Sequence, residues 1–174
     1  MIDFERLGML YANKFDSLPE VAQHRMLQLL LEGARYRLGT ENLLSTDCSG
    51  VLSWPLLLMG YRVRVTADEF YRIFYTIDYE STHTWRDETL AVFYLEGGVA
   101  THVSAGVGRQ VILDAWDEAH PVELKDLPTT VTWYREHGYD VKLRGLDWDA
   151  MHAIMLSSGA YGVDELVTAL TTHE

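Results

Sequence analysis

Apolar and polar positions change their spacing along the chain, from a helical repeat to strand-like alternation and back. In the first third, apolar side chains recur at helical spacing, at Ile2, Leu7, Leu10 and Tyr11 and again at Val21, Leu27, Leu30 and Leu31. The stretches LAVFYLE, ATHVSAGV and QVILDAW, within 90–116, are rich in valine and aromatic residues and are separated by the turn signals GG and GR. This texture predicts consecutive antiparallel strands.

Weaker strand patterns follow at 130–134 and 139–145, and helical patterns return at 148–156 and 163–170. Helices come first, a sheet follows, and helices close the chain. This order predicts an α+β fold rather than alternating β-α-β units.

Two capping boxes, at 17–20 and 66–69, predict where two helices begin. Between them, the apolar stretch 48–59 predicts a buried helix. Pro55 lies inside this stretch and removes one backbone donor, which predicts a kink or a shortened helix.

Length and composition favour one compact domain over residues 1–174, because 48% of the residues are hydrophobic and two domains would each be small. The formal net charge of −12 argues against nucleic acid or an anionic membrane as a partner, since phosphates would be repelled. No apolar run reaches the length of a membrane span, and the first residues do not read as an export signal of the Sec type. We therefore expect synthesis in the cytoplasm and, for any work outside it, a route without that signal.

The single cysteine, Cys48, lies in the stretch STDCSGVLSW, where a loop is predicted to turn into a helix. A thiolate is favoured by the free amides and the positive dipole end of a helix N-terminus, and the same amides can stabilise an oxyanion. Thr46 or Asp47 is the expected helix cap. The competing interpretation is a small buried hydrophobe, which is the commoner role of a lone cysteine.

A nucleophilic cysteine needs a base, and among seven histidines only His102 lies inside a predicted strand that would fix its ring. If the strands around the GR turn pair, Asp114 falls close to His102 and can orient the imidazole. The alternatives are a hydrogen-bonded strand histidine and a solvent-facing carboxylate. No cysteine pair and no His-x-x-x-His pattern is present, so we expect no metal site.

Four stretches carry a family resemblance: RYRLG at 35–39, TDCSGV at 46–51, THVSAGVG at 101–108 and ILDAW at 112–116. Together they resemble the NlpC-type cysteine peptidases, papain-like enzymes that cleave peptides of bacterial cell walls. The resemblance covers about residues 30–116. It implies N-terminal helices packed on a central antiparallel sheet, with residues 117–174 as a helical C-terminal extension of unassigned role.

The resemblance also implies roles for individual residues. Cys48 would attack the scissile amide, His102 would be the base, and Asp114, twelve positions later, would be the third member. Tyr36 would assist at the oxyanion and substrate region, and it has a core aromatic as its structural alternative. Asp47 and Ser49 would flank the peptide stem of the substrate.

These implications predict an endopeptidase that acts on peptidoglycan stem peptides beside a D-glutamyl residue and needs no cofactor. The chain departs from the family pattern at Leu38, where tryptophan is usual, and at Asp114, where histidine or another neutral polar residue is usual. These departures favour a divergent branch encoded by a phage or prophage, with a tail or lysis machinery as partner. Two other functions stay open: amidase or acyltransferase chemistry on the same fold, and a non-catalytic tail or assembly component.

Overall fold

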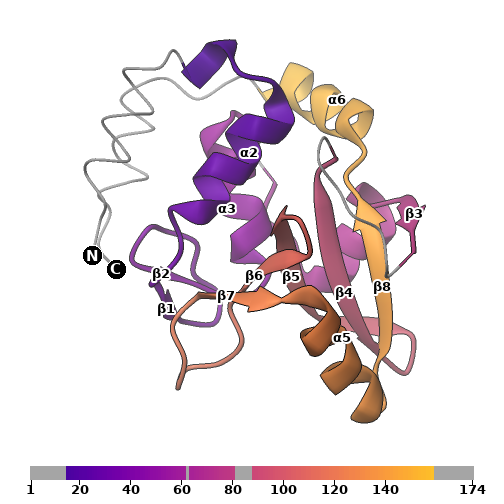
Figure 1. The fold of residues 1–174 in the computed structure, drawn as a ribbon. Coiled ribbons are helices and arrows are strands. Elements are labelled where there is room, and N and C mark those ends of the chain that lie inside the picture. Colours follow the sequence, from indigo (N-terminus) through magenta and orange to yellow (C-terminus); the bar gives the residue numbers. More distant parts are fainter. Residues whose placement is uncertain (1–14, 62, 81–87, 159–174) are drawn as a thin grey trace.

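The computed structural model describes residues 15–61, 63–80 and 88–158, which form helices and strands in an α+β arrangement (Figure 1). A 3-10 turn covers Phe15–Ser17, and the helices are α2 (Glu20–Leu29), α3 (Gly50–Leu58), α4 (Ala67–Glu69) with the π-helical turn η2 (Phe70–Phe74), α5 (Leu127–Glu136) and α6 (Trp148–Ser158). The strands are β1 (Arg35–Tyr36), β2 (Ser45–Thr46), β3 (Ile77–Tyr79), β4 (Leu90–Glu96), β5 (Val99–Gly108), β6 (Val111–Asp114), β7 (Glu123–Asp126) and β8 (Asp140–Gly145). The predicted fold class is confirmed.

The main sheet is antiparallel, with the strand order β3-β8-β4-β5-β6-β7 in the described residues. The strands β1 and β2 pair in parallel as a separate small sheet. The strands predicted around 90–116 are confirmed. Gly97 and Gly98, which join β4 to β5, both have positive φ, a backbone conformation that glycine adopts without strain.

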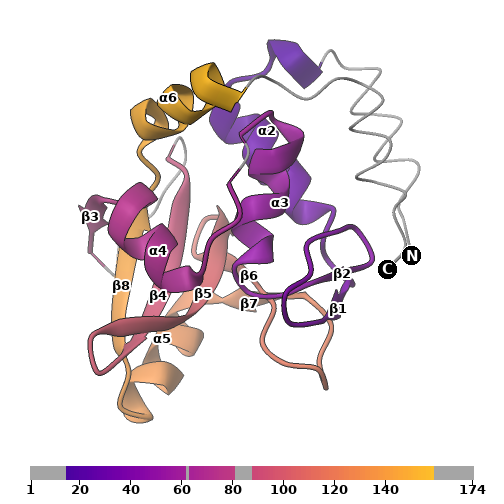
Figure 2. The same ribbon diagram turned by 180° about the vertical axis from the view of Figure 1, so that it is seen from behind.

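Each face of the main sheet is covered by different helices, because side chains alternate along its strands. Ala91, Phe93 and Leu95 belong to the core cluster that contains residues of α2, α3 and α4. Leu90, Val92 and Tyr94 belong to a second cluster, beneath α5. Figures 1 and 2 show α4 and α5 on opposite faces of the sheet. The two faces therefore have separate apolar cores.

The stretch 130–134, predicted as a strand, lies inside helix α5, so that prediction was wrong. The Asp126 carboxylate caps this helix by accepting a hydrogen bond from the Thr129 backbone N–H at 2.9 Å. Pro128 stands in the first turn, where its missing N–H is not needed. These start signals outweighed the β-propensity of the following valine, threonine and aromatic residues. The predicted strand at 139–145 is confirmed as β8.

The two predicted capping boxes have different outcomes. The pair at 17–20 does not form the predicted start, because α2 begins at Glu20 behind Pro19 and has no side-chain cap. The pair at 66–69 is confirmed: the Glu69 N–H donates to Thr66 Oγ1, and the Thr66 N–H donates to the Glu69 carboxylate. The helical segment that it opens ends at Phe74, and residues 77–79 form β3.

The predicted buried helix forms as α3 and continues through Pro55. Pro55 cannot donate to the carbonyl of Val51, one turn earlier. The side-chain amide of Gln28 on α2 donates to that carbonyl at 3.5 Å. A neighbouring helix thus replaces part of the missing bond. The predicted helix at 148–156 is confirmed as α6, and those at the N-terminus and at 163–170 lie outside the described residues.

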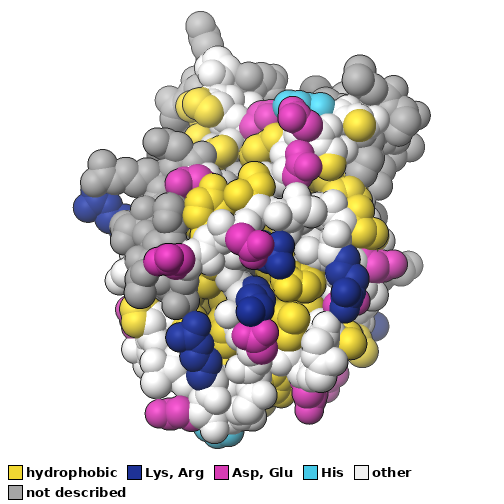
Figure 3. All heavy atoms as spheres, turned by 90° about the vertical axis from the view of Figure 1, so that its right-hand side faces the viewer, with side chains coloured by type: hydrophobic (Ala, Val, Ile, Leu, Met, Phe, Trp, Pro, Cys, Tyr) yellow, Lys and Arg dark blue, Asp and Glu magenta, His cyan; other side chains and the backbone are white. Residues whose placement is uncertain are grey.

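The face that shows β3 and β8 carries basic and acidic side chains next to one another (Figure 3). Arg144 pairs with Asp78 at 2.9 Å, and Lys142 pairs with Asp140 at 3.0 Å. The pair of Lys142 and Asp140 is exposed on both sides, and such pairs contribute little stability. None of the helices in the described ranges is both long enough and apolar enough to cross a membrane.

Candidate active site

Cys48 lies in the tight turn between β2 and α3, and the carboxylate of Asp47 holds this turn together. Asp47 Oδ1 accepts hydrogen bonds from the Gly50 N–H at 2.7 Å and from Ser49 Oγ at 3.1 Å. Asp47 Oδ2 accepts from the Gly39 N–H at 2.7 Å. Helix α3 begins at Gly50 with Ser49 as its N-cap, so the prediction of Thr46 or Asp47 at that position was wrong, although the Asp47 carboxylate binds the first helical N–H.

The turn also depends on the absence of a side chain at Gly50. A Cβ atom at this position would lie 2.7 Å from the carbonyl oxygen of Thr40 and closer still to Thr46 Oγ1. Any other residue would push the 39–41 loop away from the helix start. Glycine after the serine is therefore a packing requirement of the turn that presents the thiol.

Two donors near the thiol are available to a developing oxyanion. The backbone N–H of Cys48 has no hydrogen-bond acceptor among the described residues. Burial raises the pKa of Tyr36, and the charges of Cys48 and Asp47 raise it further, so its hydroxyl keeps its proton. Tyr36 thus lies near enough to the thiol for their charges to interact, and its role at an oxyanion stays a prediction.

His102 lies on β5 with its ring buried between Cys48 and Asp114. The ring Nε2 lies 2.7 Å from Asp114 Oδ1; because the ionised carboxylate can only accept, Nε2 carries the proton and donates it. The side chain and charge of Cys48 also raise the pKa of this ring, so the sulfur lies close to His102, and Nδ1 is the ring nitrogen that Asp114 leaves free. The structure therefore brings the three predicted residues together, with His102 hydrogen-bonded to Asp114.

The electrostatics of these three residues favour a protonated imidazole beside a charged carboxylate. Burial lowers the pKa of His102, but the hydrogen bonds and charges of Asp114 and Cys48 outweigh it and raise the pKa to about 9. Burial raises the pKa of Asp114, but its bonds to His102 and Lys125 outweigh this effect and lower the pKa to about 2. The site is thus arranged to hold an imidazolium.

The strand register brings the polar side chains on β5 and β6 onto one face. Ala105 pairs with Leu113, so Ser104 lies opposite Asp114 and His102 lies diagonally from it. Ser104 Oγ donates to Asp114 Oδ1 at 2.8 Å. Since Ser104 has one hydroxyl proton, the Tyr94 hydroxyl, 3.2 Å away, is the donor to Ser104.

Sequence reasoning missed two cations that bind these carboxylates. Arg64 donates to Asp47 Oδ2 at 2.7 Å and to Ser49 Oγ at 2.6 Å, and Lys125 donates to Asp114 Oδ2 at 2.9 Å. Both lie far in sequence from their partners, and neither stands in a recognisable motif. Asp47 and Ser49 therefore make their hydrogen bonds to other residues of the chain. Their contact with substrate stays a prediction.

A cavity of about 670 Å³ opens beside Tyr36 and is lined by Gly33, Ala34, Arg35, Tyr36, Arg37, Leu43, Leu44, Ser45 and Glu118. The arginines stand on either side of Tyr36 in sequence, and within the described residues neither forms an ion pair. Cys48, His102 and Asp114 do not line this cavity, and Tyr36 is the lining residue whose pKa responds to the charge of Cys48. No group of three or more potential metal ligands occurs among the described residues.

Solved structures with a similar fold share this architecture. The NlpC/p60 domain of the peptidoglycan hydrolase SagA aligns with a TM-score of 0.54 at 17% identity, over 70% of this chain and 96% of that domain. The chain has the NlpC/p60 fold. NlpC1 from Trichomonas vaginalis aligns with a TM-score of 0.52 at 19% identity, over 72% of this chain and 43% of its own.

A Staphylococcus aureus protein of the NLP/P60 family, described as similar to lipoprotein, aligns with a TM-score of 0.51 at 22% identity, over 71% of this chain and 40% of its own. This chain thus spans less than half of the T. vaginalis and S. aureus chains but nearly all of the SagA domain. No known protein family profile matches the sequence, and no curated protein matches it significantly. The NlpC/p60 likeness is therefore one of fold.

Proposed function

We propose that this protein is a cysteine peptidase that hydrolyses amide bonds in the stem peptides of peptidoglycan. The observation that carries the proposal is the proximity of Cys48, just before α3, to a buried His102 that is hydrogen-bonded to Asp114. It supplies a nucleophile, a proton carrier and an orienting carboxylate in an NlpC/p60 fold. The SagA domain, which has a similar fold, belongs to a peptidoglycan hydrolase.

Catalysis would proceed in two halves. The Cys48 sulfur attacks the amide carbonyl carbon, and the oxyanion is held by the Cys48 N–H and the Tyr36 hydroxyl. The C–N bond breaks as His102 gives its Nδ1 proton to the leaving amine, which leaves a thioester. His102 then takes a proton from water, the hydroxide attacks the thioester, and the C–S bond breaks to release a carboxylic acid, which restores the Cys48 thiolate and the His102 imidazolium.

The cavity beside Tyr36 is the proposed binding site for the stem peptide. Stem peptides carry free carboxylates next to the scissile bond, and guanidinium groups bind carboxylates well. Arg35 and Arg37 line the cavity with Tyr36 between them. In a chain with a net charge of −12, two such arginines in the cavity favour an anionic peptide over a neutral one.

Digestion of purified muropeptides, followed by mass spectrometry, tests the proposal. We expect the parent protein to yield two peptide fragments whose summed mass exceeds the substrate by one water. Cys48→Ala should abolish cleavage and leave the melting temperature nearly unchanged, because the thiol is only half-buried and the substitution removes a single sulfur atom. Intact muropeptides after incubation with a correctly folded parent protein would reject the peptidase.

The same digestion separates the other functions. An acyltransferase leaves an adduct heavier than the substrate, an amidase separates the peptide from its sugar, and a tail or assembly component leaves the substrate unchanged. A phage or prophage origin, and a tail or lysis route to the wall, stay predictions.

A further inference from the structure

We infer that Lys125 is a positioning residue of this site, whose ammonium group holds and partly neutralises the Asp114 carboxylate. The inference extends the proposed function, because it concerns the same catalytic line. It adds a fourth group to the nucleophile, the imidazole and the carboxylate. That group was not recognisable from the sequence.

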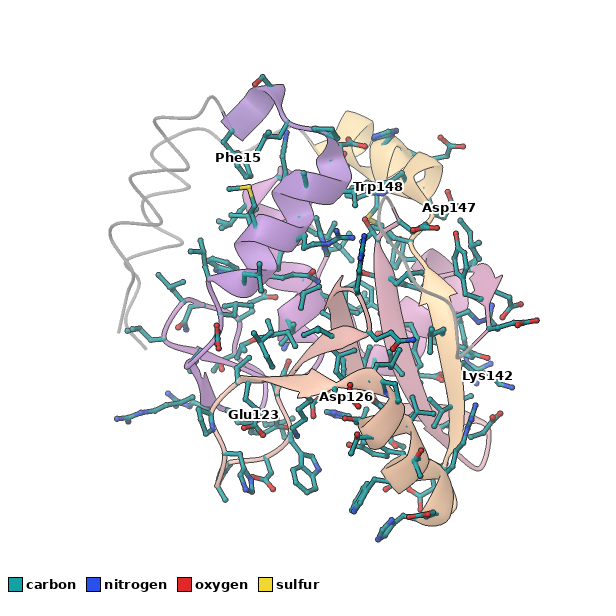
Figure 4. All side chains as sticks on the ribbon, in the orientation of Figure 1. Phe15, Glu123, Asp126, Lys142, Asp147 and Trp148 are labelled. Atoms are coloured by element: carbon teal, nitrogen blue, oxygen red, sulfur yellow. The ribbon has the colours of Figure 1, made fainter. Side chains whose placement is uncertain are left out.

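The strand register places Lys125 where it can act. Figure 4 labels Glu123 and Asp126 at the two ends of β7, the edge strand that carries Lys125. Glu123 pairs with Asp114 across the sheet, so Lys125 lies diagonally from Asp114 on the same face. Its Nζ lies 2.9 Å from Asp114 Oδ2, whereas His102 and Ser104 bind Oδ1. Both oxygens of the carboxylate are therefore fixed.

Lys125 is itself held in place by its neighbours. Its Nζ lies 4.6 Å from the centroid of the Trp116 ring, within the range of a cation–π contact, and 3.4 Å from Glu123. The Lys125 side chain is 21% exposed, and that of Asp114 is 1% exposed. A lysine held on three sides acts on the carboxylate from one fixed position.

A buried carboxylate needs this second cation. Removing a charged carboxylate from water is costly unless donors and opposite charges surround it. With Lys125 present, the Asp114 carboxylate lies between two cations, the His102 imidazolium and the Lys125 ammonium. Without it, Asp114 would act on His102 alone and hold the imidazolium proton more tightly. A ring that holds its proton too tightly is a poor acid toward the leaving amine.

The chain contains a matched control in Lys142. Its Nζ lies 3.0 Å from Asp140 Oδ2, nearly the same distance as in the Lys125 pair, but the two side chains are 42% and 60% exposed. This pair stands on β8, on the exposed face described above, and makes no contact with the catalytic line. Lys142→Met therefore removes the same charge from the protein without touching the site.

The test compares pH profiles of the rate of peptide cleavage. We expect Lys125→Met to lower the maximal rate about tenfold and to move the alkaline limb, where His102 loses its proton, upward by about half a pH unit or more. Lys125→Arg should restore the parent profile, and Lys142→Met should match it. In an Asp114→Asn background, adding Lys125→Met should leave the limb unmoved, because Lys125 acts through the carboxylate.

A fall in rate with an unmoved limb would show a purely structural role and overturn the inference, as would a Lys125→Met profile equal to that of the parent. If muropeptides are not the substrate, the His102 ring can be titrated instead by NMR of the parent and the variants. An upward shift of the His102 pKa in Lys125→Met then supports the inference even if the proposed substrate fails. An unchanged His102 pKa overturns it.

Discussion

Replacing Asp114 by asparagine removes one negative charge from the catalytic line and preserves its shape. The asparagine side-chain oxygen can still accept the hydrogen bond from His102 Nε2, which is 2.7 Å long in the parent. The substitution therefore separates the charge of the third residue from its orienting hydrogen bond. With the charge gone, burial acts on the His102 pKa with less opposition and lowers it.

The size of the effect follows from the His102 pKa. Its rise from 6.5 to about 9 corresponds to about 3 kcal/mol in favour of the imidazolium. At about pH 8 the parent ring stays about nine-tenths protonated, whereas a ring returned to its ordinary pKa is protonated in about one molecule in thirty. We therefore expect a loss of activity of about thirtyfold or more at that pH, and a much smaller loss near pH 6.

Initial rates of muropeptide cleavage across the pH range measure this directly. The alkaline limb of the Asp114→Asn profile should lie at a lower pH than that of the parent. Stability gives an independent measurement, because a raised His102 pKa contributes stability below pH 6.5 that is lost as the pH rises through about 9. The parent should lose stability over that window, and the variant should lose less. An Asp114→Asn profile with the parent's alkaline limb would refute the reasoning.

Two further predictions concern a buried histidine and the cavity. His24 is 1% exposed, and burial lowers its pKa to about 4. Below pH 6.5 the histidine therefore binds a proton in the unfolded chain but not in the folded chain. The free energy of unfolding, measured by urea titration, should thus fall by up to about 3 kcal/mol as the pH drops from 6.5 toward 4. His24→Gln should reduce that fall. Equal falls in the parent and the variant would contradict the prediction. Arg37→Gln should raise KM about tenfold for peptides with a D-isoglutamate carboxylate and little for amidated D-isoglutamine peptides. Equal rises for both peptides would exclude the carboxylate contact.

Local patterns in the sequence were enough to predict much of the fold and the candidate site. Alternation around two glycine-containing turns predicted β4, β5 and β6, because side chains of a half-buried sheet must alternate. Spacing along those strands then brought His102 near Asp114, and their hydrogen bond confirms that proximity. Cys48 before an apolar helix was predicted because helix N-termini favour anions and because its flanking residues resemble a known family.

Errors arose where a short local signal competed with another. A strand was predicted at 130–134 because valine, threonine and aromatic residues dominate there, yet Asp126 and Pro128 start a helix just before it. The Ser17 capping box failed because Pro19 stands next to Glu20, where the helix begins. In both cases the residues at the helix start decided the structure.

The sequence by itself determined the fold class, since that depends on periodicity and turn residues, and it predicted Cys48, His102 and Asp114 as a set from their local patterns and a family resemblance. Only the tertiary structure decided which charges surround that set. Arg64 binds Asp47, which lies 17 residues away in sequence. Lys125 binds Asp114, 11 residues away, from the edge strand β7, which the sequence pattern did not reveal. A cation can neutralise a buried carboxylate from any segment that folds against it, so the pairing is set by strand register and packing rather than by a local motif.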